Sequence, residues 1–86
     1  MKRIYNDIPV ESILYTIGGL QRVKIIDYPT QYDCSNCKNG TVVFDGLVKD
    51  TYGYKLAKYT EAKVYETRIE DDALVFDVFT KYEEYK

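Results

Sequence analysis

The chain has 86 residues, a formal net charge of −2, 45% hydrophobic and 30% charged residues. This length accommodates one small domain, residues 1–86, and excludes a second independent core. The charge excludes the strongly basic field of proteins that neutralise long nucleic-acid backbones, and no apolar run reaches the ~20 residues that span a bilayer.

The amino terminus, "MKRIYNDIPVES", has no apolar run followed by a small-residue cleavage site, so no secretory signal is expected. Two cysteines are too few for the disulfide framework of a small secreted domain. We therefore expect a cytoplasmic protein that does not bind a membrane.

The stretch "NDIPVESILYTIGG" predicts a helix near the amino terminus. Asn6 or Asp7 is placed to cap it. The pair Gly18-Gly19 is expected to end it in the left-handed conformation that helix C-termini favour. Its apolar residues recur with the spacing of one helix face: Val10, Ile13, Leu14 and Ile17.

Two segments rich in β-branched residues predict strands, 20–28 ("LQRVKIIDY") and 41–50 ("TVVFDGLVKD"). A bulge or bend is expected at Gly46. Three side chains of the second strand are expected to share one face: Val42, Phe44 and Val48. The turn-rich stretch between the strands, which contains both cysteines, is expected to be the tip of a hairpin.

Residues 63–82 predict a second hairpin, with an acidic turn at 70–72. Both faces of its last strand are apolar, which predicts a central strand or a partner on the second face. Residues 52–60 are compatible with a short helix or a loop. The sequence therefore predicts an α+β fold, with one N-terminal helix packed on an antiparallel sheet of about four strands in two hairpins.

The stretch "YDCSNCKNG" contains the two cysteines, Cys34 and Cys37, in a Cys-x-x-Cys spacing. This spacing is typical of a zinc knuckle, but structural zinc takes four ligands and the chain has no histidine. Two subunits that each supply both cysteines would complete the site and form a zinc-linked homodimer. The alternatives are two reduced thiols without a ligand, or a redox pair, for which the expected turn lacks an activating helix N-terminus.

Catalysis is not expected, because the chain has neither histidine nor a phosphate-binding glycine loop. The ten tyrosines are the larger signal. In the stretch 52–65 tyrosines alternate with lysines, and the candidate binding residues are Tyr52, Tyr54, Lys55, Lys58 and Tyr59. Tyrosines are common in protein interfaces, and with lysines they also bind bases and phosphates. A protein partner is therefore the leading hypothesis, and a single-stranded nucleic acid or nucleotide is the alternative.

Three segments, "IPVESILYTIGGLQRVKIIDY", "TVVFDGLVKD" and "IEDDALVFDV", resemble a loose class of short bacteriophage and prophage proteins. The resemblance covers most of the chain, but its motifs are structural and carry no catalytic residues. It implies an accessory protein that acts in the cytoplasm of a bacterial host by binding another protein. By analogy of class, this includes inhibitors of host defence systems such as anti-CRISPR proteins.

Overall fold

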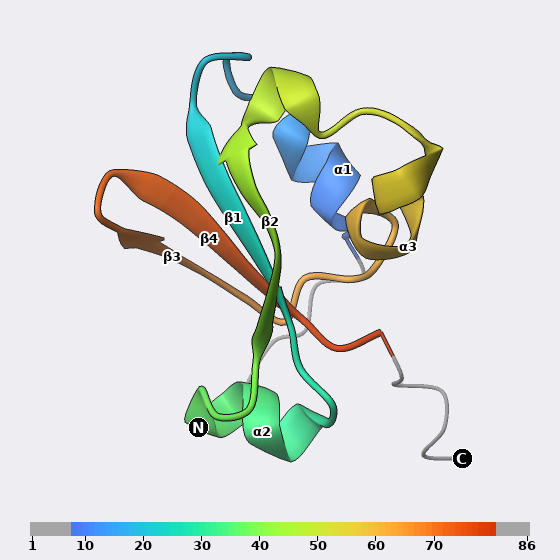
Figure 1. Ribbon diagram of the computed structural model, residues 1–86, viewed down its shortest axis with the longest axis vertical. Coiled ribbons are helices and arrows are strands. Elements are labelled where there is room, and N and C mark those ends of the chain that lie inside the picture. Colours follow the sequence, from blue (N-terminus) through green and yellow to red (C-terminus); the bar gives the residue numbers. More distant parts are fainter. Residues whose placement is uncertain (1–7, 81–86) are drawn as a thin grey trace.

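The computed structural model describes residues 8–80, except for the side chain of Tyr54. These residues form a four-stranded sheet and three short α-helices, which confirms the α+β class (Figure 1). The strands are β1 (Arg22–Asp27), β2 (Thr41–Leu47), β3 (Glu66–Glu70) and β4 (Ala73–Val78). The helices are α1 (Val10–Leu14), α2 (Gln31–Asn36) and α3 (Ala57–Thr60), with the 3-10 turns η1 (Val48–Asp50) and η2 (Tyr54–Leu56).

The sheet is mixed, with the strand order β2-β1-β4-β3. The outer pairs β1/β2 and β3/β4 are antiparallel, but the central strands β1 and β4 run parallel, with Val23 beside Leu74 and Asp27 beside Val78. The prediction of an antiparallel sheet is therefore wrong for the central pair. β4 reaches β1 only after the long connection through η1, η2 and α3, and local sequence patterns carry no information on how the two antiparallel pairs meet.

The second hairpin has the predicted acidic turn, with Asp71 and Asp72 between β3 and β4. Their φ angles are 50° and 65°, the backbone expected of a type I′ turn, and aspartate tolerates this conformation better than most residues do. β4 occupies a central position in the sheet, as its two apolar faces predict. Residues 52–60, which the sequence left open, contain η2 and α3.

Helix α1 is much shorter than the sequence predicts, although its apolar face is confirmed. Val10 and Leu14 are buried, and the other two members of the face pack against them. The helix ends early because the hydroxyl and the N–H of Thr16 both donate to the Ile13 carbonyl, at 2.7 and 3.0 Å, in competition with the regular helical pattern. The expected left-handed glycine stop is wrong, since Gly53 is the glycine with positive φ among residues 8–80. The expected caps, Asn6 and Asp7, lie outside the described residues.

The cysteine stretch is not the tip of a hairpin. It forms helix α2, whose N-cap Thr30 accepts a hydrogen bond from the Asp33 N–H at 3.0 Å. The Thr30 hydroxyl also donates to the Asp33 carboxylate at 2.9 Å. This Thr-x-x-Asp pair is close to a capping box, a signal that the turn-rich composition obscured. Figure 1 shows α2 at one end of the long axis of the molecule, with α1 and α3 toward the other end.

Strand β2 contains a bulge, but at a different place from the prediction. The register shifts between Ile25 and Ile26 of β1, which pair with Phe44 and Val42, so that Val43 is the extra residue. Phe44 and Val43 consequently both pack against the core, whereas Val42 is exposed. Of the three side chains expected to share a face, Phe44 and Val48 both contact the main core and Val42 does not. The expected bulge at Gly46 is wrong, because Gly46 pairs regularly with Val23.

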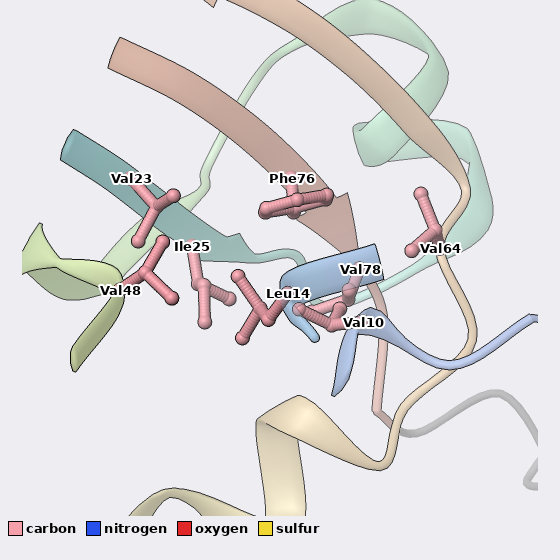
Figure 2. Packing of buried hydrophobic residues seen from close by; sticks show 8 residues of the cluster. All are labelled: Val10, Leu14, Val23, Ile25, Val48, Val64, Phe76 and Val78. Carbon is pink, nitrogen blue, oxygen red and sulfur yellow. The ribbon is translucent and has the colours of Figure 1, made fainter. Parts of the chain in front are cut away.

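The main core lies between α1 and the central strands of the sheet (Figure 2). Side chains from α1, β1 and β4 point toward one another there, and single residues from η1 and from the segment before β3 close the two ends. The buried members are Val10, Leu14, Val23, Ile25, Val48, Val64, Phe76 and Val78. Because this set joins α1 to both central strands, it fixes the position of the segment that follows α1.

We predict that Leu14→Ala lowers the free energy of unfolding by about 2–5 kcal/mol, because it leaves a cavity between α1 and the sheet. Leu20→Ala is the matched control, since Leu20 is 77% exposed and Leu14 only 1%. Urea unfolding followed by circular dichroism measures both. Equal stabilities of the two variants would contradict the position of α1.

Candidate functional site

Two exposed tyrosines from distant parts of the chain lie side by side. The rings of Tyr15 and Tyr52 are stacked, with centroids 6.1 Å apart and planes 11° from parallel. They are 66% and 58% exposed. Single exposed aromatic residues are common, but a pair whose partners come from different elements forms a contiguous aromatic surface.

The neighbours of each tyrosine in the chain explain its exposure. Tyr15 directly follows Leu14, the last residue of α1, so that burial of Leu14 in the core directs Tyr15 away from it. Tyr52 follows Thr51, which is buried, and whose hydroxyl and N–H both donate to the Val48 carbonyl at 2.7 and 3.0 Å. Both aromatic side chains are therefore attached to fixed backbone.

The two tyrosines line a pocket of about 420 Å³ between α1 and the segment 51–61, a volume within the usual range of ligand sites. Leu14, Ala57 and Thr60 contribute to its lining, and two carboxylates, those of Glu11 and Glu61, also line it. Among residues 8–80, no lysine or arginine lines it. We call this the Tyr15–Tyr52 pocket.

Of the predicted binding residues whose side chains the structure describes, Tyr52 lines this pocket and the other three do not. Lys55 and Lys58 are exposed. Tyr59 packs partly against the main core, and the Lys58 ammonium lies 5.7 Å from the centre of its ring. Tyr54 begins η2, but its side chain lies outside what the structure describes.

Tyr15 is a site residue that the sequence prediction missed. The available signal was its position in the predicted helix, because it lies next to Leu14 but outside the apolar face formed by Val10, Ile13, Leu14 and Ile17. An aromatic residue on the polar side of an amphipathic helix has no core to enter and is therefore a candidate for binding.

The two cysteines lie in different environments. Cys34 is a residue of α2, and its side chain is fully buried. This burial, with a smaller contribution from the charge of Asp77, raises the pKa of its thiol to about 12. Cys37 is exposed and has the left-handed backbone with φ 54°. Both are free thiols. Among residues 8–80, no group of three or more His, Cys, Asp or Glu side chains is placed to hold a metal ion.

This arrangement does not fit a pair of zinc ligands. Zinc binds the thiolate, and Cys34 is both inaccessible and held in its protonated form. Cys34 would have to leave its buried position before the two thiolates could converge on a metal shared with a second subunit. The zinc-linked homodimer remains a prediction.

A buried ionic group lies next to Cys34 on the face of the sheet opposite the main core. Asp77 of β4 is fully buried and forms an ion pair with Arg68 of β3. Arg68 pairs with Oδ2 of Asp77, and the Tyr28 hydroxyl donates to Oδ1 of the same carboxylate at 3.5 Å. Arg68 Nε also donates to Glu70 Oε2 at 2.7 Å. Arg68 and Asp77 lie on the two strands of the predicted second hairpin, but the burial of Asp77, which makes this pair significant, depends on the cover from α2 and its neighbours.

Burial raises the pKa of the Asp77 carboxyl, although the positive charge of Arg68 and its hydrogen bond oppose this change. Burial and the negative charge of Asp77 likewise raise the pKa of Tyr28. A second small cluster of side chains covers this ionic group and consists of Tyr28, Cys34 and Tyr65, with Ile26 and Phe79 against them. Asp77 and Cys34 are thus sealed from solvent, and their role is to join α2 to the sheet.

Comparison of the chain with family models, curated proteins and solved structures yields no match. Among residues 8–80, no helix combines the length and the apolar composition needed to cross a membrane. Function is therefore inferred from the geometry of the site.

We predict that Asp77→Asn changes the pH dependence of stability. The folded chain binds the Asp77 proton at a higher pH than the unfolded chain does, so protonation of Asp77 adds to the free energy of unfolding as pH falls from neutral toward ~4. The variant lacks this contribution, and the difference in unfolding free energy, wild type minus variant, should rise over that range. Urea unfolding at several pH values measures it, with Asp45→Asn on an exposed strand position as the control. A flat difference for Asp77→Asn would contradict the assignment.

We predict that Cys37→Gly stabilises the protein by about 0.5–1 kcal/mol. The N–H groups of Lys38 and Cys37 donate to the carbonyls of Asp33 and Cys34 at 3.0 and 3.3 Å, a Schellman motif in which Cys37 occupies the position that glycine prefers. Thermal unfolding and light scattering on the same samples measure the effect. Dissociation of a dimer together with loss of bound zinc would instead support the zinc-linked homodimer.

Proposed function

We propose that this chain is a non-enzymatic protein-binding module, and that it binds its partner through the surface formed by Tyr15 and Tyr52. The observation that carries the proposal is the stacked, exposed tyrosine pair at the edge of a pocket. Tyrosine combines a large rigid apolar area with a polar tip and is enriched among the residues that dominate binding energy in interfaces.

The chemistry of the described residues supports binding over catalysis. Asp77 and Cys34 have raised pKa values, the usual mark of a catalytic group, but both are fully buried and a substrate has no access to them. The residues that line the Tyr15–Tyr52 pocket include neither a histidine nor a cysteine. Its lining does include threonine hydroxyls and carboxylates, but the Thr51 hydroxyl donates to the Val48 carbonyl. No hydrogen bond between described residues joins a lining hydroxyl to Glu11 or Glu61 as a nucleophile and its base would be joined.

The same lining favours a protein over a nucleic acid. Phosphate groups bind where lysine and arginine gather, whereas this pocket contains the carboxylates of Glu11 and Glu61. Lys55 and Lys58, on which the nucleic-acid alternative depends, are exposed but do not line it. The resemblance to phage accessory proteins is consistent with a protein partner in a bacterial host, including a component of a defence system.

Selection of peptides from a random displayed library on the immobilised protein tests the proposal. We expect selected peptides to lose at least tenfold in affinity for Tyr15→Ala and for Tyr52→Ala, about 1.4 kcal/mol, since each removes half of the aromatic surface. Tyr32→Ala is the matched control, because Tyr32 is 73% exposed and lies on α2 at the other end of the molecule. Peptides whose affinity depends on Tyr32, or on none of these residues, would refute the proposal.

A further inference from the structure

We infer that the Tyr15–Tyr52 pocket receives a basic side chain of the partner, the ammonium of a lysine or the guanidinium of an arginine. This inference rests on the proposed function and specifies what that surface recognises. Three features of the pocket lead to it: its charge, its aromatic edge and its apolar floor.

The charge of the pocket is negative and uncompensated. Glu11 belongs to α1 and Glu61 directly follows α3, so two separate elements bring carboxylates to one pocket. Neither forms an ion pair within the part of the chain that the structure describes. An anionic ligand would be repelled there, and an apolar ligand would take water from two carboxylates without replacing their hydrogen bonds. A neutral polar ligand could replace hydrogen bonds but not balance the charge. A cation supplies both the charge and the donors.

The aromatic edge and the apolar floor suit a long basic side chain in particular. A cation near the face of a tyrosine ring is stabilised by ~0.5–1 kcal/mol where exposed and by ~2 kcal/mol where water is excluded. The methylene stem of a lysine or arginine can pack on Leu14 and Ala57 while its charged end meets the carboxylates. A compact inorganic cation has no apolar stem to pack on this floor.

The chain's own lysines in this region do not line the pocket. Lys58 lies over the ring of Tyr59, 5.7 Å from its centre, and Lys55 is exposed. A partner's basic side chain would therefore meet the two carboxylates without displacing a lysine of the 51–61 segment from the pocket.

The test uses the peptides that bind wild-type protein and require Tyr15 and Tyr52. We expect each to contain a lysine or arginine whose replacement by norleucine or citrulline, respectively, lowers affinity at least tenfold. The double variant Glu11→Gln with Glu61→Gln should lower affinity for the original peptide equally, and the norleucine or citrulline peptide should not distinguish it from wild type. This double-mutant cycle measures the coupling between the cation and the pocket.

The control is Asp71→Asn with Asp72→Asn, which also removes two negative charges but at the β3–β4 turn. It should change affinity less than twofold, which separates local pairing from a general effect of net charge. The single variant Glu61→Gln, at an exposed position, provides a second measurement if the double variant is unstable.

The outcomes separate the two proposals. Peptides that need both tyrosines but contain no essential basic residue, or that bind the glutamine variants with unchanged affinity, would overturn the cation inference and leave the protein-binding function standing. Peptides that need neither tyrosine would overturn both. Coupling of more than tenfold with lysine peptides, arginine peptides or both supports the inference and identifies which cation the pocket prefers.

Discussion

The parallel pairing of β1 with β4 is the contact on which the rest of this structure depends. Each of these strands also has an antiparallel neighbour, so their pairing joins the two halves of the chain into one sheet. It also places the two most buried strands at the centre, where both faces must be covered. α1 covers one face and α2, with its aromatic neighbours, covers one end of the other.

The two faces have different chemistry and different roles. On the first, α1 and α3 leave a pocket between them with two exposed tyrosines and two carboxylates. On the second, Asp77 is buried beside aromatic side chains and Cys34 and forms an ion pair with the partly exposed Arg68. Asp77 of this pair is fully buried, whereas the two tyrosines of the pocket are exposed. The buried carboxylate with the raised pKa is therefore separate from the surface that we propose for binding.

The sequence predicted what depends on residues near one another in the chain. The acidic turn at Asp71-Asp72, the strand segments and the buried face of α1 follow from alternation and from local backbone preferences. The parallel pair and the stack of Tyr15 on Tyr52 depend on contacts between distant residues, for which one sequence carries no direct signal. Helix α2 is an intermediate case. Its N-cap, Thr30, could be recognised in the sequence, but the helix is short and is surrounded by turn-forming residues.

The edges of the sheet limit how this protein associates with itself. The bulge at Val43 interrupts the regular backbone of the edge strand β2, and the other edge strand, β3, has glutamates at both ends with Arg68 between them. If two copies of β3 paired antiparallel about Arg68, Glu66 of one would face Glu70 of the other, and like charges opposite each other are destabilising. Both edges therefore oppose the strand-to-strand addition by which small sheets aggregate. The charges of β3 restrict the registers in which two copies of this chain could join through this edge.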